Sequence, residues 1–527
     1  MPAAPVVDAP PVPPADRERR RSWPFLRQAP VSLLIVAVPI VVGAVRLVAT
    51  LHRPFTAGGD VAFIELTIRD ALHGRVSLGP YSRFGWHHLG PAVFYLFAPL
   101  YALSGHSSRS LFLDAWLLNS GCAVGIVLLV RRGAGEVAAR LAAAVFCLYI
   151  GAVAFGTLIN PWNPSLLAMP LVLMLTAVAL AATGSAWALV VAAASGSYLV
   201  QTHLGTAPIV GIALVAGFIA WWFRNRRDPV PWRKPLVAGG LLLGLLWVAP
   251  LAQQVFGTDG NLTRVVRFYA SPPASAGVNG HALHPSAQIV ANYATVVPFG
   301  NPDLVTRHHR GAAAAGWAAL GVVVGALAWR RHRFIAWLAL ATPVSLVVAV
   351  LAATRVIGAL ERYLFQWTEA LTVPVIMATL ALLVTVAGRL APRAGPLIGG
   401  VTLVVGVLAS VAATGVIVHA DIISYGDSPE ARQVAARIED AIGHDRSKVI
   451  QINVVQQQFV DGPILLELAK QGYQFRLTPV MDLYAGTTSR PANGPTFALR
   501  SSAAAGAPLN GTHLITVESV DVWQQAP

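Results

Sequence analysis

The chain has 527 residues, of which 55% are hydrophobic and only 12% are charged. Soluble domains carry about 25% charged residues, so this composition excludes a soluble enzyme and indicates a multi-pass membrane protein. The formal net charge of +14 could indicate a nucleic-acid partner, but the arginines follow membrane topology, and we expect no nucleic acid. The two cysteines, Cys122 and Cys147, lie in apolar segments and leave no disulfide framework.

The N-terminal residues 1–29 are rich in proline and then in arginine, which predicts a disordered basic tail on the cytoplasmic side. The apolar run that follows is long, and no small-residue cleavage site comes after it. We therefore interpret it as a membrane span and not as a cleaved signal peptide.

Spanning helices need about 20 mostly apolar residues each. The segment 89–105 contains Pro91 and Pro99 and is predicted to be a surface or half-inserted helix. Without it, every dense arginine cluster falls in a loop on one side, as the positive-inside rule requires. The sequence then predicts eleven spans, at 30–50, 110–130, 138–156, 165–183, 185–200, 205–223, 235–255, 312–329, 334–353, 367–387 and 395–418.

This topology defines a transmembrane domain over 30–418, with loops 51–109 and 257–311 on the outer face of the cell membrane. At His419 the composition becomes polar, and helical and strand-like patterns alternate. That alternation predicts a small α/β domain over 419–527, which the topology places outside the cytoplasm.

The first outer loop contains the leading candidate for catalysis, Asp60. It follows Gly58-Gly59, which allow close approach of a substrate, and a carboxylate at a bilayer boundary is costly unless it has a task. The same position predicts an N-cap for the next helix. Glu65 and Arg69 are four residues apart and predict a surface ion pair worth about 0.2–0.5 kcal/mol; the alternative for Glu65 is a role in substrate binding.

The sequence YSRFGWHHLGP, residues 81–91, follows in the same loop. Its aromatic residues are typical of a membrane interface, while Arg83, His87 and His88 suit an anionic headgroup or a sugar. The alternative is an interfacial belt with no ligand. Adjacent histidines could bind a metal, but no third ligand is nearby. No P-loop, Rossmann or H-E-x-x-H motif is present, so we expect no cofactor and no metal.

Arginine also recurs in the other outer loops, where the positive-inside rule disfavours it. Arg264 and Arg267 lie in one loop, and Arg355 and Arg362 lie in a loop of about a dozen residues between two predicted spans. The planar guanidinium can donate two hydrogen bonds to a phosphate, which predicts a site for a phosphate-linked substrate. The alternative is scattered charge with local pairing, such as Glu361 with Arg362.

Two short outer loops place polar groups at membrane depth. One contains Asn160, Trp162 and Asn163, and the other contains His203. Amide and indole groups beside proline breaks suit sugar binding, and these residues are candidates for the acceptor side. Helix capping is the alternative, and for His203 a structural hydrogen bond competes with a role as proton carrier.

Taken together, these features resemble a known family. A span is followed by an outer loop with an early acid, Asp60, then by a surface helix entered through His88-Leu-Gly-Pro91, then by a span that ends at Arg131-Arg132. This plan is similar to that of the GT-C superfamily of integral membrane glycosyltransferases, in the group around the RgtA/B/C/D-like and ArnT/PMT-type enzymes. The resemblance covers the N-terminal half and, by number, the later spans.

The resemblance implies a GT-C-like fold and an activity. Members transfer a sugar from a polyprenyl phosphate or pyrophosphate donor to an acceptor outside the cytoplasm, without a nucleotide sugar and with an acid in the first loop as general base. That role maps to Asp60. The commoner paired acids are absent here, because valine follows Asp60 and Glu65 is the next acid. Many actinobacterial members add an outer C-terminal domain, which 419–527 would match.

The sequence thus predicts an inverting glycosyltransferase of the cell membrane that acts on a lipid-linked donor and an envelope glycan, lipid or protein acceptor. Arg83, His87, His88 and Arg362 are expected at the phosphate, with Arg264 and Arg267 in reserve. The alternatives are a transporter or flippase of lipid-linked glycans and a non-catalytic envelope-assembly protein. A polymerase or ligase that moves a whole glycan would use the same site.

Overall fold

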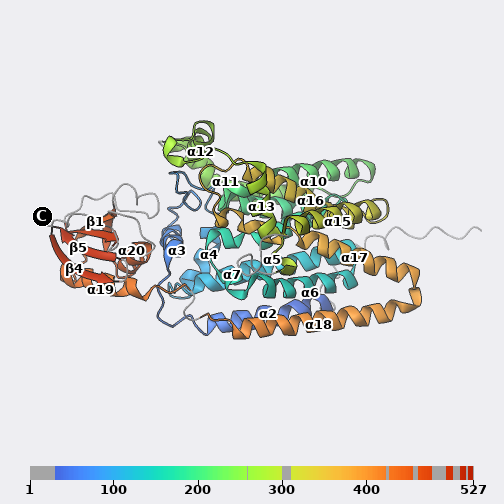
Figure 1. Cartoon of the computed structure of the whole chain (residues 1–527), viewed down its shortest axis with the longest axis horizontal. Coiled ribbons are helices and arrows are strands. Elements are labelled where there is room, and N and C mark those ends of the chain that lie inside the picture. The colour runs from blue at the N-terminus through green and yellow to red at the C-terminus, as the bar shows by residue number, and fades with distance from the viewer. Residues whose placement is uncertain are drawn as a thin grey trace, which may run out of the picture.

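The computed structural model of the chain describes residues 30–257, 259–299, 310–422, 426–454, 461–477, 494–501, 511–517 and 520–525. Figure 1 shows a long bundle of helices with a small mixed domain at one end. The predicted N-terminal tail, 1–29, lies outside the described residues, as do residues 258 and 300–309 of the predicted loop 257–311.

The membrane bundle agrees with the predicted spans. Ten described helical segments are long and apolar enough to cross a membrane, and the shorter apolar helix α9 occupies the place of the eleventh. The helices are α2 (Val31–Val48), α5 (Ser110–Ala134), α6 (Glu136–Val153), α8 (Ala168–Ala181), α9 (Ala186–Thr202), α10 (Ala207–Arg227), α11 (Arg233–Phe256), α15 (Arg310–Ala328), α16 (Arg333–Ala353), α17 (Val373–Leu390) and α18 (Gly395–His419).

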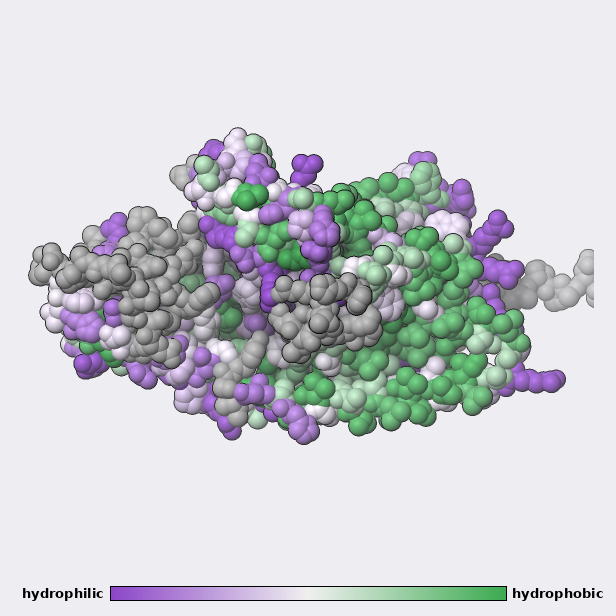
Figure 2. Space-filling model, viewed as in Figure 1, coloured by the Kyte–Doolittle hydropathy of each residue, from purple (hydrophilic) through white to green (hydrophobic). Residues whose placement is uncertain are grey.

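An apolar belt surrounds this bundle. Figure 2 shows hydrophobic residues over the right-hand part of the molecule, with hydrophilic residues at its right-hand tip and again toward the left. Many exposed large apolar side chains lie on α2, α10, α11 and α18. Exposed apolar side chains in such number are costly in water and are satisfied by lipid, so the belt marks the part of the chain that lies in the bilayer.

Small residues allow the spanning helices to pack closely. A Cβ on Gly43 would lie 2.7 Å from the Trp116 ring, and one on Gly406 would lie 2.4 Å from Ile35. In a bilayer, where lipid is as apolar as leucine, such close approach is the main source of helix association. Gly43 and Gly406 therefore bring α5 and α18 against α2.

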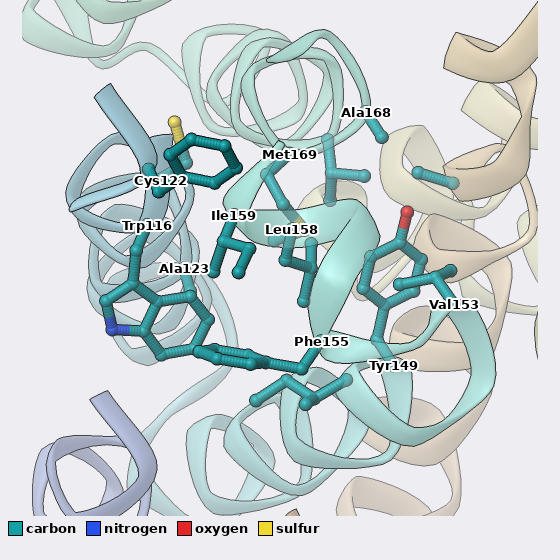
Figure 3. Close-up of a cluster of buried hydrophobic side chains, with 14 of the residues drawn as sticks. Trp116, Cys122, Ala123, Tyr149, Val153, Phe155, Leu158, Ile159, Ala168 and Met169 are labelled. Carbon is teal, nitrogen blue, oxygen red and sulfur yellow. The ribbon is translucent and has the colours of Figure 1, made fainter. Parts of the chain in front are cut away.

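Between α6 and α8 the chain leaves the helical path, and buried hydrophobic side chains pack around this segment (Figure 3). Ala154 has a φ of 68°, which ends α6 and starts the short helix α7 (Phe155–Ile159). The Phe155 and Trp116 rings meet edge to face with centroids 5.0 Å apart. The Asn119 amide donates to the Leu158 carbonyl at 2.8 Å. The cluster fixes where the next loop, 160–164, emerges.

One end of the bundle, which we call the loop end, carries α3 (Gly59–Ala71), α4 (Ala92–Leu103) and α12 (Asn261–Ala270). The 12 residues of α4 span about 18 Å, too little to cross a bilayer of about 30 Å. The other short helices, which connect elements elsewhere in the chain, are η2 (Asn163–Leu166), η3 (Leu204–Thr206), η4 (Ala274–Ala276), α13 (Leu283–Ala294), α14 (Val296–Phe299), η7 (Arg362–Ala370) and η8 (Pro392–Ala394).

In its described residues, the C-terminal domain has a five-stranded sheet and two helices, as the alternating pattern predicted. Its strand order is β2-β1-β3-β5-β4, with β1 parallel to β2 and β3, and β5 antiparallel to β3 and β4. Helix α20 lies between the sheet and α3 (Figure 1). The elements are α19 (Pro429–Ile442), β1 (Val449–Val454), α20 (Asp461–Lys470), β2 (Gln474–Leu477), β3 (Thr496–Ser501), β4 (Gly511–Val517) and β5 (Val520–Gln525).

Candidate active site

A cavity of about 700 Å³ lies at the loop end of the bundle. Its polar wall comes from the first turn of α3, the loop 81–88 and the loop 162–164. Its apolar wall comes from the start of α10 and the end of α16. A pocket with one apolar side and a few convergent polar groups is the usual form of a small-molecule site.

Asp60 lies on this cavity with both carboxylate oxygens engaged. Tyr81 Oη donates to Oδ1 at 2.5 Å, and Trp162 Nε1 donates to Oδ2 at 3.0 Å. The donors come from two loops far apart in the sequence, so they fix the direction of the carboxylate without help from its own helix. Each oxygen keeps a lone pair for a hydroxyl in the cavity.

The predicted N-cap role of Asp60 is wrong. The N-cap of α3 is Gly58, in an extended conformation, and no side chain caps the helix. Gly59 has a φ of 52°, a conformation that favours glycine. This turn starts the helix one residue before Asp60, so the carboxylate lies in the first turn and points into the cavity.

Residues 79–88 form a short hairpin that carries three of the site residues. Gly79 N donates to the His88 carbonyl at 3.0 Å, and His88 N donates to the Pro80 carbonyl at 2.9 Å. The hairpin packs so closely on Gln201 that a Cβ on Gly79 would lie 2.4 Å from the Gln201 carbonyl oxygen. Tyr81, Arg83 and His88 all reach the cavity from this hairpin.

Two arginines supply positive charge to the cavity. Arg83 lines it and pairs with Glu361 at 3.7 Å, with both side chains more than a third exposed. Such an exposed pair is worth about 0–1 kcal/mol, so it leaves Arg83 available to a stronger anionic partner. Arg355, two residues after the end of α16, is exposed and lines the same cavity.

His88 and His203 lie side by side on the wall, with ring centroids 4.8 Å apart. The Leu204 backbone N–H donates to His88 Nδ1 at 3.0 Å, and the Gly205 backbone N–H donates to His203 Nδ1 at 3.2 Å. An Nδ1 that accepts carries no proton, so in both neutral rings the proton is on Nε2. Each ring is therefore a hydrogen-bond donor at its other edge.

Burial keeps these rings uncharged. It lowers the pKa of His88 well below the ordinary value, and the neighbouring His203 and His87 lower it further. Burial lowers the pKa of His203 to about 4. Neither imidazole takes up a proton near neutral pH, and neither is suited to act as general base there.

The other predicted residues on this side form the frame of the cavity. His87 Nδ1 contacts the Gly79 carbonyl at 3.1 Å, and its backbone N–H donates to Asn261 at 2.8 Å. The pKa of His87 lies below its ordinary value, because the effect of burial exceeds the opposing effect of the contact with the Gly79 carbonyl. Asn160 accepts from the Trp162 backbone N–H at 3.0 Å, and Asn163 donates to the Thr202 carbonyl at 3.2 Å. Of these, Asn163 lines the cavity.

Besides His87 and Asn160, four further predicted residues lie off the cavity. Arg264 pairs with Asp259 at 2.8 Å, and Arg267 and Arg362 are exposed. The predicted surface pair of Glu65 with Arg69 is wrong, because Glu65 is fully buried and binds Lys470 at 2.8 Å. For these four residues the sequence shows the charge of the side chain, but it does not show whether the side chain faces the cavity.

Several cavity residues are absent from the set that the sequence predicts. The sequence predicts only an interfacial aromatic at Tyr81, which in the structure binds Asp60. Tyr363 also lines the cavity and packs against Trp162, with ring centroids 5.6 Å apart. Arg355 was grouped with Arg362, and only the first reaches the cavity. Within the described part of the chain, no group of three or more His, Cys, Asp or Glu side chains could hold a metal ion.

Solved structures with the same arrangement of helices decide the fold. Crystal structures of ArnT from Cupriavidus metallidurans, bound to undecaprenyl phosphate and in the apo state, superpose with a TM-score of 0.54 each. Each match covers 94% of this chain and 99% or 98% of ArnT. The chain has the ArnT fold.

The likeness to ArnT confirms the GT-C-like fold predicted from the sequence. It extends over both the membrane bundle and the C-terminal part, since 94% of the chain is covered. Identity to ArnT is 14% and 13%, so the shared property is the fold. The sequence matches no family model and no curated protein.

Proposed function

We propose that the chain is a membrane glycosyltransferase that moves a sugar from a polyprenyl-phosphate donor to an acceptor of the cell envelope. The observation that carries the proposal is the placement of the Asp60 carboxylate in a cavity that also contains two arginines and opens along apolar helices. The ArnT fold adds support, because one of the ArnT structures is bound to undecaprenyl phosphate.

The cavity offers a place for each part of such a donor. Arg83 and Arg355 would bind the phosphate, because a guanidinium can donate two hydrogen bonds to it. The apolar wall from α10 and α16, which includes Pro208, Ile212 and Leu351, would take the first isoprene units. The sugar would then lie between the arginines and Asp60.

In the reaction, Asp60 would take the proton from an acceptor hydroxyl. That oxygen attacks the anomeric carbon, the bond from this carbon to the phosphate oxygen breaks, and the polyprenyl phosphate leaves with the electron pair. Configuration at the anomeric carbon is inverted. General-base assistance is typically worth 10²–10⁴-fold, and positive charge at the leaving phosphate lowers the barrier further.

Tyr81 and Trp162 would serve this step by holding both Asp60 oxygens in one direction. The Nε2–H groups of His88 and His203 would donate to acceptor-only oxygens such as those of the phosphate. The topology predicted from the arginine clusters would put the loop end, with the C-terminal domain, on the outer face of the cell membrane. Glycan, lipid and protein acceptors of the envelope are all reached from that side.

A donor panel tests the proposal. Purified full-length protein would be incubated with several polyprenyl-phosphate sugars and an envelope extract, and products would be read by mass. We expect release of polyprenyl phosphate and one product that is heavier by a sugar. Movement of intact donor across a vesicle membrane, with no product from any donor, would instead support the flippase.

A further inference from the structure

Glu65 is a buried acid that the proposed reaction does not use. It lies on α3 five residues after Asp60, which is about 140° around the helix, so the two carboxylates face opposite sides. Its side chain is fully buried, yet it binds Lys470 Nζ at 2.8 Å and accepts from Tyr101 Oη at 2.9 Å. Lys470 also contacts Ser108. The partner of Glu65 therefore comes from α20 of the C-terminal domain.

A second set of contacts ties the residues before Asp60 to the start of that domain. Gly58 N donates to the Gly426 carbonyl at 2.9 Å, and Ser428 N donates to the Thr56 carbonyl at 3.0 Å. Thr56 Oγ1 donates to Glu467 Oε1 at 2.6 Å. The backbone on the N-terminal side of α3 thus depends on residues that follow α18.

The two helices are also in close contact between these points. A Cβ on Gly462 of α20 would lie 2.7 Å from the Phe63 ring, so only glycine fits. Arg69 donates to the Ala469 carbonyl at 3.2 Å. One face of α3 therefore lies on α20, and the other presents Asp60 to the cavity.

A buried ion pair is a poor means of adhesion, because desolvation offsets much of its attraction, but it demands one geometry. Apolar contacts are not directional, so they restrict the rotation of α3 less strictly than a buried ion pair does. We propose that Glu65 and Lys470 are positioning residues, and that the C-terminal domain completes the active site by holding α3 with Asp60 toward the cavity. This inference rests on the proposed function of Asp60.

Lys470→Met tests it, because methionine keeps the length of the side chain but leaves Glu65 buried without a cation. The matched control is Lys448→Met in the same domain, since Lys448 pairs with Asp445 at 3.4 Å on the surface. Lys470→Arg keeps the charge, and Glu65→Gln/Lys470→Met removes both charges and guards against simple unfolding. All variants would be made in the full-length protein.

Two readouts are needed. Hydrogen exchange of the peptide 56–71 reports the mobility of α3 whether or not the protein is active. The second readout is kcat for transfer, measured with the affinity for undecaprenyl phosphate and repeated in an Asp60→Asn background. A residue that acts through Asp60 loses its effect once Asp60 is replaced.

We expect exchange in 56–71 to rise in Lys470→Met and to stay at the wild-type level in Lys448→Met and Lys470→Arg. We expect kcat to fall on the order of 10- to 100-fold, affinity for undecaprenyl phosphate to stay within about twofold, and no further loss in the Asp60→Asn background. Unchanged exchange, or equal losses of kcat with and without Asp60, would overturn the inference. If the wild type is inactive with every donor, the proposed function fails, and the exchange result alone decides whether α20 holds α3.

Discussion

Two replacements of His88 test the contributions of its two ring nitrogens, Nδ1 and Nε2, one at a time. In His88→Asn the amide oxygen takes the place of Nδ1 and still accepts from the Leu204 N–H, but nothing replaces the Nε2–H donor. In His88→Gln the amide nitrogen reaches the place of Nε2, and the acceptor for Leu204 is lost. The two variants therefore remove the ligand-facing hydrogen bond and the structural hydrogen bond one at a time.

The expected effects have a definite size. A hydrogen bond to a charged group contributes about 1.5–3 kcal/mol. Its loss in His88→Asn should weaken binding of undecaprenyl phosphate by about 10- to 150-fold. His88→Gln should bind within about threefold of wild type but unfold at a lower temperature, because an unpaired buried N–H costs about 1–3 kcal/mol.

The assay measures the affinity of purified protein in nanodiscs for undecaprenyl phosphate, with inorganic phosphate as competitor, and the thermal midpoint of each variant. If His88→Asn binds as tightly as wild type while His88→Gln loses affinity, the donor edge has no ligand and the tautomer argument is refuted.

Three further predictions follow from the same geometry. Arg83→Ala should raise KM for the lipid-linked donor about tenfold or more and leave the thermal midpoint within a degree or two, since its pair with Glu361 is exposed; an unchanged KM would remove Arg83 from the phosphate site. Burial lowers the pKa of His203 from 6.5 to about 4, so between these pH values the folded state binds fewer protons than the unfolded state. The free energy of unfolding should therefore fall as the pH drops from about 6.5 through 4. In thermal melts, His203→Asn should make this dependence on pH less steep. A cysteine at the exposed Ser447 should react with an impermeant maleimide in intact cells while one at the exposed Arg389 should not, with the buried native cysteines silent; the reverse labelling would invert the predicted topology.

The transmembrane architecture could be predicted because its signal is local. A run of about 20 apolar residues must satisfy its own backbone in lipid, so the length of the run determines the helix. The proline-containing segment 89–105 was expected not to span, and α4 is too short to do so. Helix α9, with 17 residues, is the one predicted span in the described bundle that falls below 18 residues, since α8 is extended by η2 to a segment of 19 residues, Asn163–Ala181.

The contents of the site were only partly predictable. Asp60 was found from an acid behind two glycines, yet the positive φ of Gly59 shifts the helix start and removes the expected cap. The partner of Glu65 could not be found from local spacing, since Lys470 lies at the opposite end of the chain and binds in place of Arg69. Arg355 and Arg362 are the same residue type in one predicted loop, so the sequence does not distinguish them. The structure does, because Arg355, which follows α16, lines the cavity and Arg362, in η7, does not.

The most direct test of the central claim is the rate of sugar transfer by Asp60→Asn. Asparagine keeps the size of the side chain and can accept from Tyr81 or Trp162, but it cannot take a proton from an acceptor hydroxyl. With a donor that the wild type uses, we predict a fall in kcat of about 10²–10⁴-fold and an unchanged affinity for undecaprenyl phosphate. Transfer at the wild-type rate by purified Asp60→Asn protein would contradict the account.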